Sequence, residues 1–411
     1  MRKITLLFIL TAFSFLNAQE RNCGQEHAMQ QLQFNPLMQG IYEQQKIQSE
    51  QEYQNLLSSS NALQVNNTLI IPVAIHYPSS GGANATLRNC LRQLAQNQVD
   101  ILNEDYNAYN ADISTWDNTS SPYFPGVNKG VMNVEFEIAT LNHPAGSGLL
   151  EGEPAITFGY NFGGSSDWDS TWAGYLNIVV DNLSGGTLGY AYLASNPSSG
   201  AAVFINSQAF GSGSGCTGYV PGAPYNLGRT LTHELGHYMN LSHIWGSGTC
   251  GNDFVADTPV HNTANGGCPP ISHLSTCSGT PRELTMNYMD YTNDACMYMF
   301  TAGQATRMQA HLNTIQSNFN YSTLSNENFD VNETRIALYP NPNNGLFDVT
   351  LSNNYLLNSV AIYDIAGRLV YEQDDINNDV LKIDLTSSNS GIYTVVVNSE
   401  IGIFNSKIVI K

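Results

Sequence analysis

The sequence predicts an α+β domain with a mixed sheet and a helix at its functional centre, followed by a small all-β sandwich. Three observations lead to this fold class. Between residues 60 and 320, strand-like apolar runs come before a second strongly helical segment, an order typical of α+β domains. Residues 336–411 consist of short strand-like runs separated by turn sequences. Hydrophobic residues make up 42% of the 411 positions, enough for the cores of two to three folding units.

The first residues have the pattern of a secretory signal peptide, which we place at 1–18. A basic start is followed by an apolar run from Ile4 to Leu16 and a small-polar end at Ala18. The run is too short for a helix that crosses roughly 30 Å of hydrocarbon, which argues against a membrane anchor. No later stretch reaches spanning length, so we expect a mature protein without a membrane span, exported to an oxidising compartment.

The following elements are predicted from periodicity and turn residues. Residues 19–60 are rich in Gln, Asn and Ser and predict a poorly packed leader that could hold one helix. Within a domain at 61–322, the β-branched run 68–77 predicts a buried strand, and 86–105 an amphipathic helix. A second helix is predicted at 226–240. Further strand-like runs, separated by Gly- and Ser-rich turns, lie at 131–140, 175–182, 186–193 and 201–206.

An Asn- and Ser-rich stretch then predicts a linker, placed at 323–335. After it, residues 336–411 contain about seven short strands divided by Asn-Pro-Asn-Asn-Gly, Ala-Gly-Arg and Ser-Gly turns, the pattern of a small β-sandwich.

Composition excludes two classes of partner. Fifteen basic residues stand against 34 acidic ones, which gives a formal charge of −19. A chain with this balance has little to neutralise phosphates, so nucleic acid and anionic lipid are unsuitable main partners. The seven cysteines are an odd number, so at least one thiol lies outside any set of intramolecular disulfides.

The segment HELGHYMNLSH carries the chemistry. His233 and His237 are four residues apart and share one helix face, so both imidazoles can reach one zinc ion at about 2.0–2.1 Å. Glu234 is placed to touch a zinc-bound water rather than the metal. His243 becomes a third ligand if the helix ends at Asn240, because Asn tolerates the left-handed conformation. A buried helix with ordinary histidines and a closed structural zinc are the alternatives, but three ligands leave an open position suited to catalysis.

This segment resembles the extended zinc motif of the metzincin metallopeptidases, HExxHxxGxxH, with Asn240 in place of the usual Gly. The segment NYMDY at 287–291 resembles their downstream Met-turn, which would place Met289 beneath the metal, although a core methionine is the simpler reading of that residue alone. Tyr291 resembles the tyrosine that stabilises the oxyanion in several metzincins. For Tyr291, core packing or zinc ligation in the resting state remain alternatives.

A longer match covers about 60–320 and resembles the pappalysin family and its bacterial members. It rests on HIWG at 243–246, CGNDFVADTP at 250–259 and MNYMDYTNDACMYMFTAGQATRM at 286–308. The resemblance implies a two-lobed metzincin catalytic domain and a zinc metalloendopeptidase that acts on protein or peptide substrates. It also implies that Gly189, Tyr190 and Ala191 lie on the edge strand that pairs with the substrate backbone.

Two specificity and cofactor expectations follow from this resemblance. A carboxylate at Asp294, in the primed-side pocket, would favour Arg or Lys at the first primed position, with a solvated loop Asp as the alternative. Asp253, Asp257 and Thr258 concentrate oxygen ligands, and the family implies calcium near them. Solvated loop carboxylates are the alternative there, since the loop lacks the EF-hand spacing.

The resemblance also sorts the cysteines. It favours the disulfides Cys250–Cys277 and Cys268–Cys296, with a zinc-cysteine cluster as the less suitable alternative. Cys90 and Cys216 have no assignable partner. The segment Arg-Asn-Cys-Gly around Cys23 resembles the cysteine switch of metzincin zymogens, in which the thiolate takes the open zinc position. It predicts a latent precursor; the alternative is an ordinary free thiol.

Residues 336–411 resemble the C-terminal sorting domain of the type IX secretion system of Bacteroidetes, through YPNPNNG, IYDIAGR and SGIY. That implies the type IX machinery as a partner and a secreted or cell-surface location; a carbohydrate-binding or adhesive module is the alternative. We expect a monomer. Two other functions stay open at this point, namely a catalytically silent adhesin and a zinc amidase or exopeptidase acting on small substrates.

Overall fold

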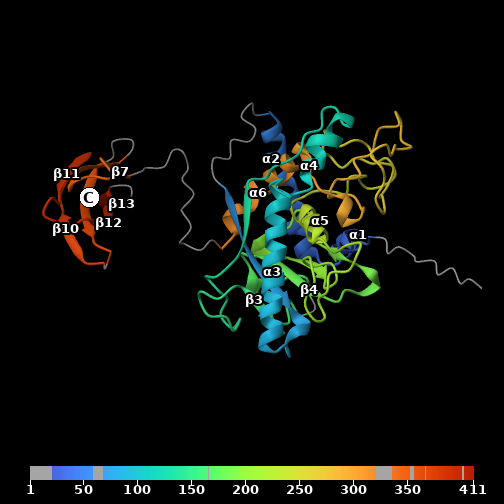
Figure 1. Ribbon diagram of the computed structural model, residues 1–411, viewed down its shortest axis with the longest axis horizontal. Coiled ribbons are helices and arrows are strands. Elements are labelled where there is room, and N and C mark those ends of the chain that lie inside the picture. Colours follow the sequence, from blue (N-terminus) through green and yellow to red (C-terminus); the bar gives the residue numbers. More distant parts are fainter. Residues whose placement is uncertain are drawn as a thin grey trace, which may run out of the picture. The chain divides into compact units, whose positions relative to one another are not determined.

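The computed structural model describes residues 21–58, 68–164, 166–320, 336–351, 356–365, 367–399 and 402–411. The predicted signal peptide and linker lie outside these residues. The chain divides into two compact units, one up to Ser325 and one from Asn326 (Figure 1). Within the described residues, no helix combines the length and the apolar character needed to cross a membrane.

The first unit is built on a mixed sheet with the strand order β2-β1-β4-β6-β5 and with β3 paired to β1. The pairs of β1 with β2, β3 and β4 and of β4 with β6 are parallel, and only β5 runs antiparallel, at the edge beside β6. The strands are β1 Leu69–Tyr77, β2 Val134–Ile138, β3 Ile156–Phe158, β4 Leu176–Asp181, β5 Gly189–Tyr190 and β6 Ala202–Asn206. This confirms the mixed sheet. The run predicted at 186–193 forms only the two residues of β5, and β3, three residues among turns, was not predicted.

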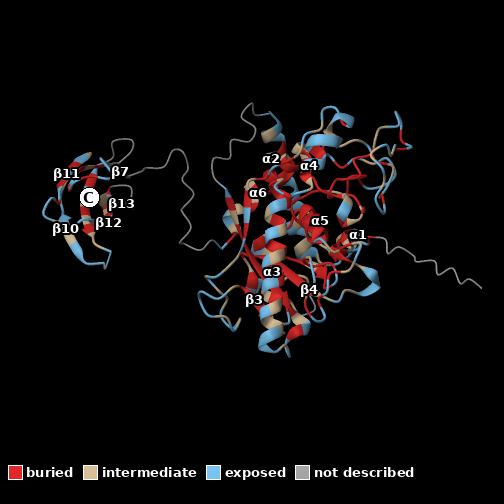
Figure 2. Ribbon diagram, viewed as in Figure 1, coloured by how far each residue is buried: buried red, intermediate tan, exposed pale blue. Residues whose placement is uncertain are grey.

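The side chains of β1 point alternately to the two faces of the sheet, and each face packs against a hydrophobic core. Ile71, Val73 and Ile75 lie in the core that also contains apolar residues of the helices α3 (Ala85–Tyr106) and α5 (Arg229–Tyr238). The residues between them face the other side, where Ala74 packs with an aromatic cluster. In Figure 2, α5 is buried along its whole length, whereas α3 exposes one face. The sheet therefore packs against one side of α5, and the loop-rich region at about 240–300 covers the other side.

The leader is better packed than its composition indicates. It forms two helices, α1 (Gln25–Leu32) and α2 (Pro36–Ser58), and α2 packs on α6 (Ala302–Ile315). The expectation of a poorly packed leader was wrong because α2 docks through polar contacts, which apolar periodicity does not reveal. Ser49 Oγ lies 2.8 Å from His311 Nδ1, Gln45 Nε2 donates to Thr314 Oγ1, and Arg307 pairs with Glu50.

The segment at roughly 240–300 of the first unit contains little regular structure. After it, α6 begins at a capping box on Thr301. One short helix, α4 (Ile113–Thr115), follows α3. Disulfides Cys250–Cys277 and Cys268–Cys296 cross-link this loop-rich region, and a third bond joins Cys90 to Cys216. Sequence patterns left Cys90 and Cys216 without partners because a spacing of 126 residues follows no local rule.

The second unit is all-β, in agreement with the prediction. Its strands form a four-stranded sheet in the order β10-β9-β12-β13 and a three-stranded sheet in the order β11-β8-β7, and all pairs are antiparallel. One core of alternating residues, among them Val349, Val360 and Val395, lies within this unit. The strands are β7 Ile336–Tyr339, β8 Leu346–Leu351, β9 Leu357–Tyr363, β10 Leu369–Gln373, β11 Val380–Asp384, β12 Gly391–Ser399 and β13 Gly402–Ile410.

Candidate active site

Three histidines converge at the end of α5. His233 and His237 project from successive turns, and their Nδ1 atoms donate to the carbonyl oxygens of Tyr288 (2.6 Å) and Leu241 (2.7 Å). These bonds orient the rings and leave both Nε2 atoms free for a metal. Nε2 of His237 lies 3.1 Å from Nε2 of His243. Two nitrogen lone pairs at this separation are expected of ligands that share one cation.

His243 reaches this point because the helix ends in a left-handed turn. Asn240 has φ of 71°, and the amide of Leu241 donates to the carbonyl of Gly236. The chain then folds back beneath α5, where the amide of Ile244 donates to the carbonyl of Met289. The left-handed Asn240 predicted from the sequence is therefore what brings the third histidine back to the first two.

Apolar and aromatic groups close the site from below. A Cβ on Gly236 would collide with Sδ of Met289, so the methionine lies directly under the helix between the two histidines. Trp245 stacks on His243 with ring centroids 4.4 Å apart. The Tyr291 ring lies 5.0 Å from His243 and 5.7 Å from His233. Met289 and Tyr291 thus both border the histidines, as expected of the Met-turn segment.

Cys23 of the leader completes a set of four candidate ligands. Its Sγ and one nitrogen of each histidine all lie within 4.8 Å of one another, and all four residues are buried. A thiol and three imidazoles form a donor set that suits zinc. Nε2 of His233 is a buried atom without a hydrogen-bond partner among the described residues, which a metal bond would satisfy. The residues present therefore fit a zinc ion.

The leader reaches the site as an added strand. The amide of Gly24 donates to the carbonyl of Gly189 (2.8 Å), and the amide of Leu188 donates to the carbonyl of Asn22 (2.8 Å). This places Cys23 in a parallel bridge with Gly189, on the edge of the sheet. A Cβ on Gly189 would lie 2.9 Å from Cγ of Glu234, so the glycine allows the edge strand to approach the acid. The Cys23 thiol lies 3.3 Å from Oε2 of Glu234.

Burial dominates the electrostatics of the site. It lowers the pKa of His233 and His243 and brings the pKa of His237 to about 4, which keeps the rings in the neutral, metal-binding form. Burial also raises the pKa of Glu234 to about 8, while the Cys23 hydrogen bond and the Arg21 charge oppose the shift. The pKa of Cys23 is raised by burial and by the charge of Glu234. A raised pKa favours the neutral thiol, but a bound divalent cation would favour the thiolate, because metal coordination deprotonates a thiol.

Asp294 is fully buried and is engaged by the leader, so it is not a solvated loop residue. Arg21 Nη2 donates to Asp294 Oδ1 at 2.5 Å, and the two side chains are 1% and 0% exposed. The Arg21 guanidinium also donates to Thr230 Oγ1 and to the carbonyl of Thr292. The other Asp294 oxygen accepts from the amide of Leu227 at 2.8 Å. The sequence analysis included Arg21 as part of the Arg-Asn-Cys-Gly segment but gave it no role of its own.

The oxygen ligands proposed for calcium are occupied within the protein. Thr258 Oγ1 donates to both Asp253 oxygens, at 2.8 and 2.9 Å. Asp257 instead accepts from Thr301 Oγ1 and from the amide of Gly303, at the start of α6. Burial raises the pKa of Asp253 to about 6. The carboxylates of Asp253 and Asp257 therefore accept hydrogen bonds from different residues and have no donor in common among these contacts.

A buried acid behind the site was missed by sequence reasoning. Asp105 of α3 accepts hydrogen bonds from Thr232 Oγ1 and from the Tyr288 hydroxyl, both at 2.7 Å. Thr232 precedes the first histidine, and the Tyr288 carbonyl holds that histidine's ring. Burial raises the pKa of Asp105 to about 6. Asp105 thus links α5 to the segment 287–291. The apolar pattern that predicts the helix at 86–105 contains no signal of this role.

Comparisons with known proteins agree with this geometry. The chain matches a peptidase family described as pregnancy-associated plasma protein-A over residues 164–313, and a secretion system C-terminal sorting domain over 337–411. It is 30% identical to a mutant of promirolysin from Tannerella forsythia, with a TM-score of 0.52 over 72% of this chain and 95% of that chain. Extracellular metalloproteases of Coccidioides posadasii and Arthroderma benhamiae are each 41% identical, over 33% and 32% of this chain.

The chain spans about half the length of these curated relatives, 48% and 49% respectively. The promirolysin match covers nearly all of that solved chain at 30% identity. On this basis the chain belongs to the pappalysin family of metallopeptidases and ends in a secretion-system sorting domain.

Proposed function

We propose that this protein is a secreted zinc endopeptidase made as a latent precursor. The observation that carries the proposal is the convergence of three imidazoles and the Cys23 thiol beside Glu234. The curated relatives named above are extracellular metalloproteases, and the promirolysin match spans nearly the whole of a precursor form. Residues 61–322 would form the catalytic domain and 19–60 the propeptide.

The catalytic roles follow from which groups border the histidines. His233, His237 and His243 would hold the zinc ion, which when bound lowers the pKa of a coordinated water towards 7 and polarises the peptide carbonyl. Glu234 accepts the proton of the attacking water and passes it to the leaving amine. Position supports this role, because Oε2 of Glu234 lies 3.3 Å from the Cys23 thiol, at the place where a zinc-bound water would take over once the leader leaves. The Tyr291 hydroxyl would donate to the oxyanion, and its ring borders His233 and His243.

Substrate would take the place of the leader on the edge strand. Gly189 and Tyr190 form β5, and Gly189 already exchanges backbone contacts with residues 22–24. An extended substrate adding to this edge, which continues into Ala191, gains affinity from backbone hydrogen bonds with little sequence preference. Binding of a peptide as an added strand explains why the cleft would accept long chains rather than only small substrates.

The preference for a basic residue at the first primed position is supported by the leader itself. Arg21 fills a buried pocket and pairs with Asp294, so the pocket accommodates a guanidinium. Substrate Arg would take the same place once the leader leaves. We expect the Asp294→Asn variant to lose most of its preference for Arg over Leu at this position in a peptide library. An unchanged preference would remove Asp294 from the specificity role.

Latency is the function proposed for Cys23. The thiolate would take the fourth zinc position and exclude water, while Arg21 holds the adjoining pocket. Removal of the leader would open both places together. If the Cys23→Ala precursor were as inactive as the wild-type precursor, ligation by Cys23 would not be what confers latency.

Structural calcium stays a prediction. The chain carries a formal charge of −19, and the Asp253 carboxylate is buried within the loop 251–262. A calcium ion at this loop should raise the melting temperature of the full-length protein, and Asp253→Asn should abolish that increase.

The C-terminal unit would carry the protein through the type IX secretion machinery, giving a secreted or cell-surface enzyme of a Bacteroidetes-type bacterium. The support is the sorting-domain match at residues 337–411. A monomeric state stays a prediction. Deletion of residues 336–411 should leave the protein in the periplasm of a type IX-competent host, which cell fractionation measures.

The proposal is tested by chelator-sensitive proteolysis. The activated protein should cleave internal bonds of casein, lose activity to a zinc chelator and regain it with zinc, and the Glu234→Ala variant should be inactive. Release of single terminal residues only would favour an exopeptidase. Absence of turnover in zinc-loaded, leader-free protein would favour the silent adhesin.

A further inference from the structure

The first helix of the leader covers an aromatic surface of the catalytic domain. We call this surface, made of Trp168, Tyr190 and Tyr192, the aromatic platform. Ala28 and Leu32 of α1 are 4% and 2% exposed where they pack on Tyr192, and Met29 and Met38 join the same cluster. Leader removal would therefore uncover an apolar surface beside the active site, and exposed patches of this kind commonly mark binding sites.

The platform is held in place by the catalytic domain alone. The ring centroids of Trp168 and Tyr192 are 4.6 Å apart, and Tyr190 stacks on Phe204 at 4.7 Å. Asp167 accepts from the hydroxyls of Tyr190 (3.1 Å) and Tyr192 (2.7 Å). None of these contacts uses a leader residue, so the rings should keep their positions after the leader leaves. A preformed surface loses little side-chain entropy when it binds a ligand.

The platform continues the edge strand that faces Glu234. Tyr190 belongs to β5, whose other residue, Gly189, pairs with Cys23. Arg21 and its Asp294 pocket lie before Cys23 in the leader, and α1 with the platform lies after it. If Asp294 forms the first primed pocket, the platform lies on the non-primed side.

The length of α1 indicates how far the platform extends along the edge strand. At about 1.5 Å per helical residue, Gln25 to Leu32 spans roughly 10 Å, a length that three to four extended residues also cover. An extended substrate along β5 would thus bring a side chain onto the platform about three to four residues before the scissile bond. The leader leaves room for such a chain. A cavity of about 640 Å³ borders α1 beside Thr187, Tyr190 and Tyr192.

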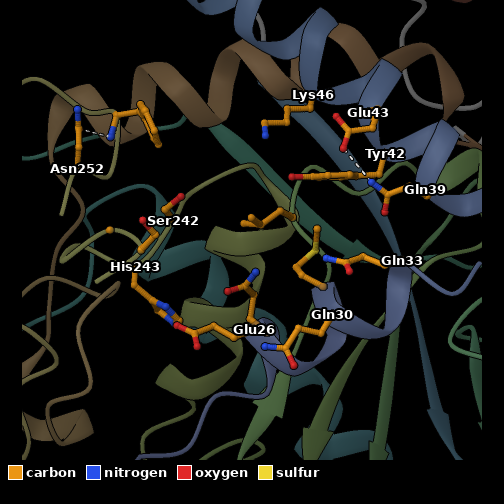
Figure 3. A pocket seen from close by; sticks show the side chains of 16 residues that line it. Glu26, Gln30, Gln33, Gln39, Tyr42, Glu43, Lys46, Ser242, His243 and Asn252 are labelled. Carbon is orange, nitrogen blue, oxygen red and sulfur yellow. Dashed lines mark hydrogen bonds between the residues drawn. The ribbon is translucent and has the colours of Figure 1, made fainter. Parts of the chain in front are cut away.

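A second cavity, of about 450 Å³, also borders α1, and Glu26 and Gln30 line both cavities. Figure 3 shows Glu26 and Gln30 of the leader extending towards the second cavity, with Ser242 and His243 on the opposite wall. The leader itself indicates an apolar occupant for the platform, because the residues of α1 that pack with the rings are Ala28, Met29 and Leu32.

We propose that the aromatic platform is a non-primed subsite for a large apolar side chain of a protein substrate, and that Leu32 and Met29 occupy it in the latent precursor. Leu or Met is the fitting occupant, because Leu32 and Met29 pack with these rings in the latent precursor. This inference rests on the proposed peptidase function and adds a specificity determinant to it.

The test compares three peptides that share one scissile bond, with Arg after it, and differ only at about the fourth residue before it: Leu, Ser or Lys. The activated, leader-free protein should cleave the Leu peptide with kcat/KM on the order of tenfold above the Ser peptide, mostly through KM. Trp168→Ala should bring the two values to within about twofold of each other. Tyr109→Ala, which removes an aromatic ring that is 77% exposed, is the matched control and should keep the preference.

An independent measurement avoids the platform variant. A peptide of residues 25–42, which lacks Cys23, should inhibit cleavage of the Leu peptide competitively, and its Leu32→Ser form should bind on the order of tenfold more weakly. Equal cleavage of the Leu and Ser peptides would overturn the subsite and leave the peptidase function standing. Preference for Lys would overturn it in favour of an acidic subsite at Asp167. Cleavage of none of the peptides would refute the peptidase function, and the subsite with it.

Discussion

The buried ion pair between Arg21 and Asp294 should control how firmly the leader is docked. In the Arg21→Ala variant, Asp294 keeps its amide donors from Leu227 and Arg229 but loses the ion pair with Arg21, in a pocket where the Arg21 and Asp294 side chains are almost fully buried. Breaking a buried pair from one side costs about 3–5 kcal/mol, because the remaining charge is left uncompensated. Only the docked leader bears this cost, since an undocked leader opens Asp294 to water. At about 1.4 kcal/mol per factor of ten, the ratio of docked to undocked leader should fall roughly 100- to 4,000-fold.

The assay is alkylation of Cys23 in chelator-treated full-length protein. Cys23 is the free cysteine of the described chain, and the six others form disulfides. Where undocking is fast compared with alkylation, the labelling rate follows the undocked fraction. Arg21→Ala should therefore label about 100-fold faster or more. Arg368→Ala is the matched control, because its ion pair with Asp364 is on the surface, with the Arg side chain 80% exposed.

Arg368→Ala should not change the labelling rate, since exposed pairs contribute about 0–1 kcal/mol. An acceleration by Arg21→Ala of less than about fivefold, the size expected of a surface pair, would refute the reasoning. It would mean that the leader is held by the backbone pairing and by α2, and not by the buried pair.

Three further predictions concern catalysis, pH and the disulfide that was not predicted. Glu234→Ala should retain zinc and the wild-type circular dichroism but lose activity by about a thousandfold or more, and substantial residual turnover would contradict its role as base. Burial lowers the pKa of His311 to about 4, against 6.5 when unfolded, so its stabilising neutral form is progressively lost as pH falls from about 6.5 towards 4. Between pH 7 and pH 4.5 the wild type should lose about 2–3 kcal/mol more unfolding free energy than His311→Gln, measured by denaturant titration; equal losses would remove His311 as the cause. The double variant Cys90→Ser, Cys216→Ser opens a bond that spans 126 residues and should cost about 4–5 kcal/mol of unfolding free energy, whereas a change below about 1 kcal/mol would show that the bond restrains little.

The parts of the fold that local pattern controls could be predicted from the sequence. Strand 68–77 and helix 86–105 carry their periods openly, and both appear within one residue of their predicted bounds as β1 and α3. The helix that carries His233 and His237 and the left-handed Asn240 follow from residue types at fixed spacing. The structure brings His233, His237 and His243 together.

Contacts between distant segments could not be predicted in this way. The docking of α2 uses single hydrogen bonds such as Ser49 to His311, which leave no periodic trace in a Gln-rich segment. Asp105 and Tyr288 meet across 183 residues, and Arg21 and Asp294 across 273. Such pairs depend on how the strands and loops are arranged in space, and only the folded chain reveals them.

The most direct test of the account is zinc-edge X-ray absorption on the full-length precursor. It should show one zinc with three nitrogen neighbours at about 2.0–2.1 Å and one sulfur neighbour at about 2.3 Å, and the sulfur should disappear in Cys23→Ser. A zinc surrounded only by nitrogen and oxygen in the wild-type precursor would contradict the latency that we propose. Folded protein that binds no zinc would contradict the metal site itself.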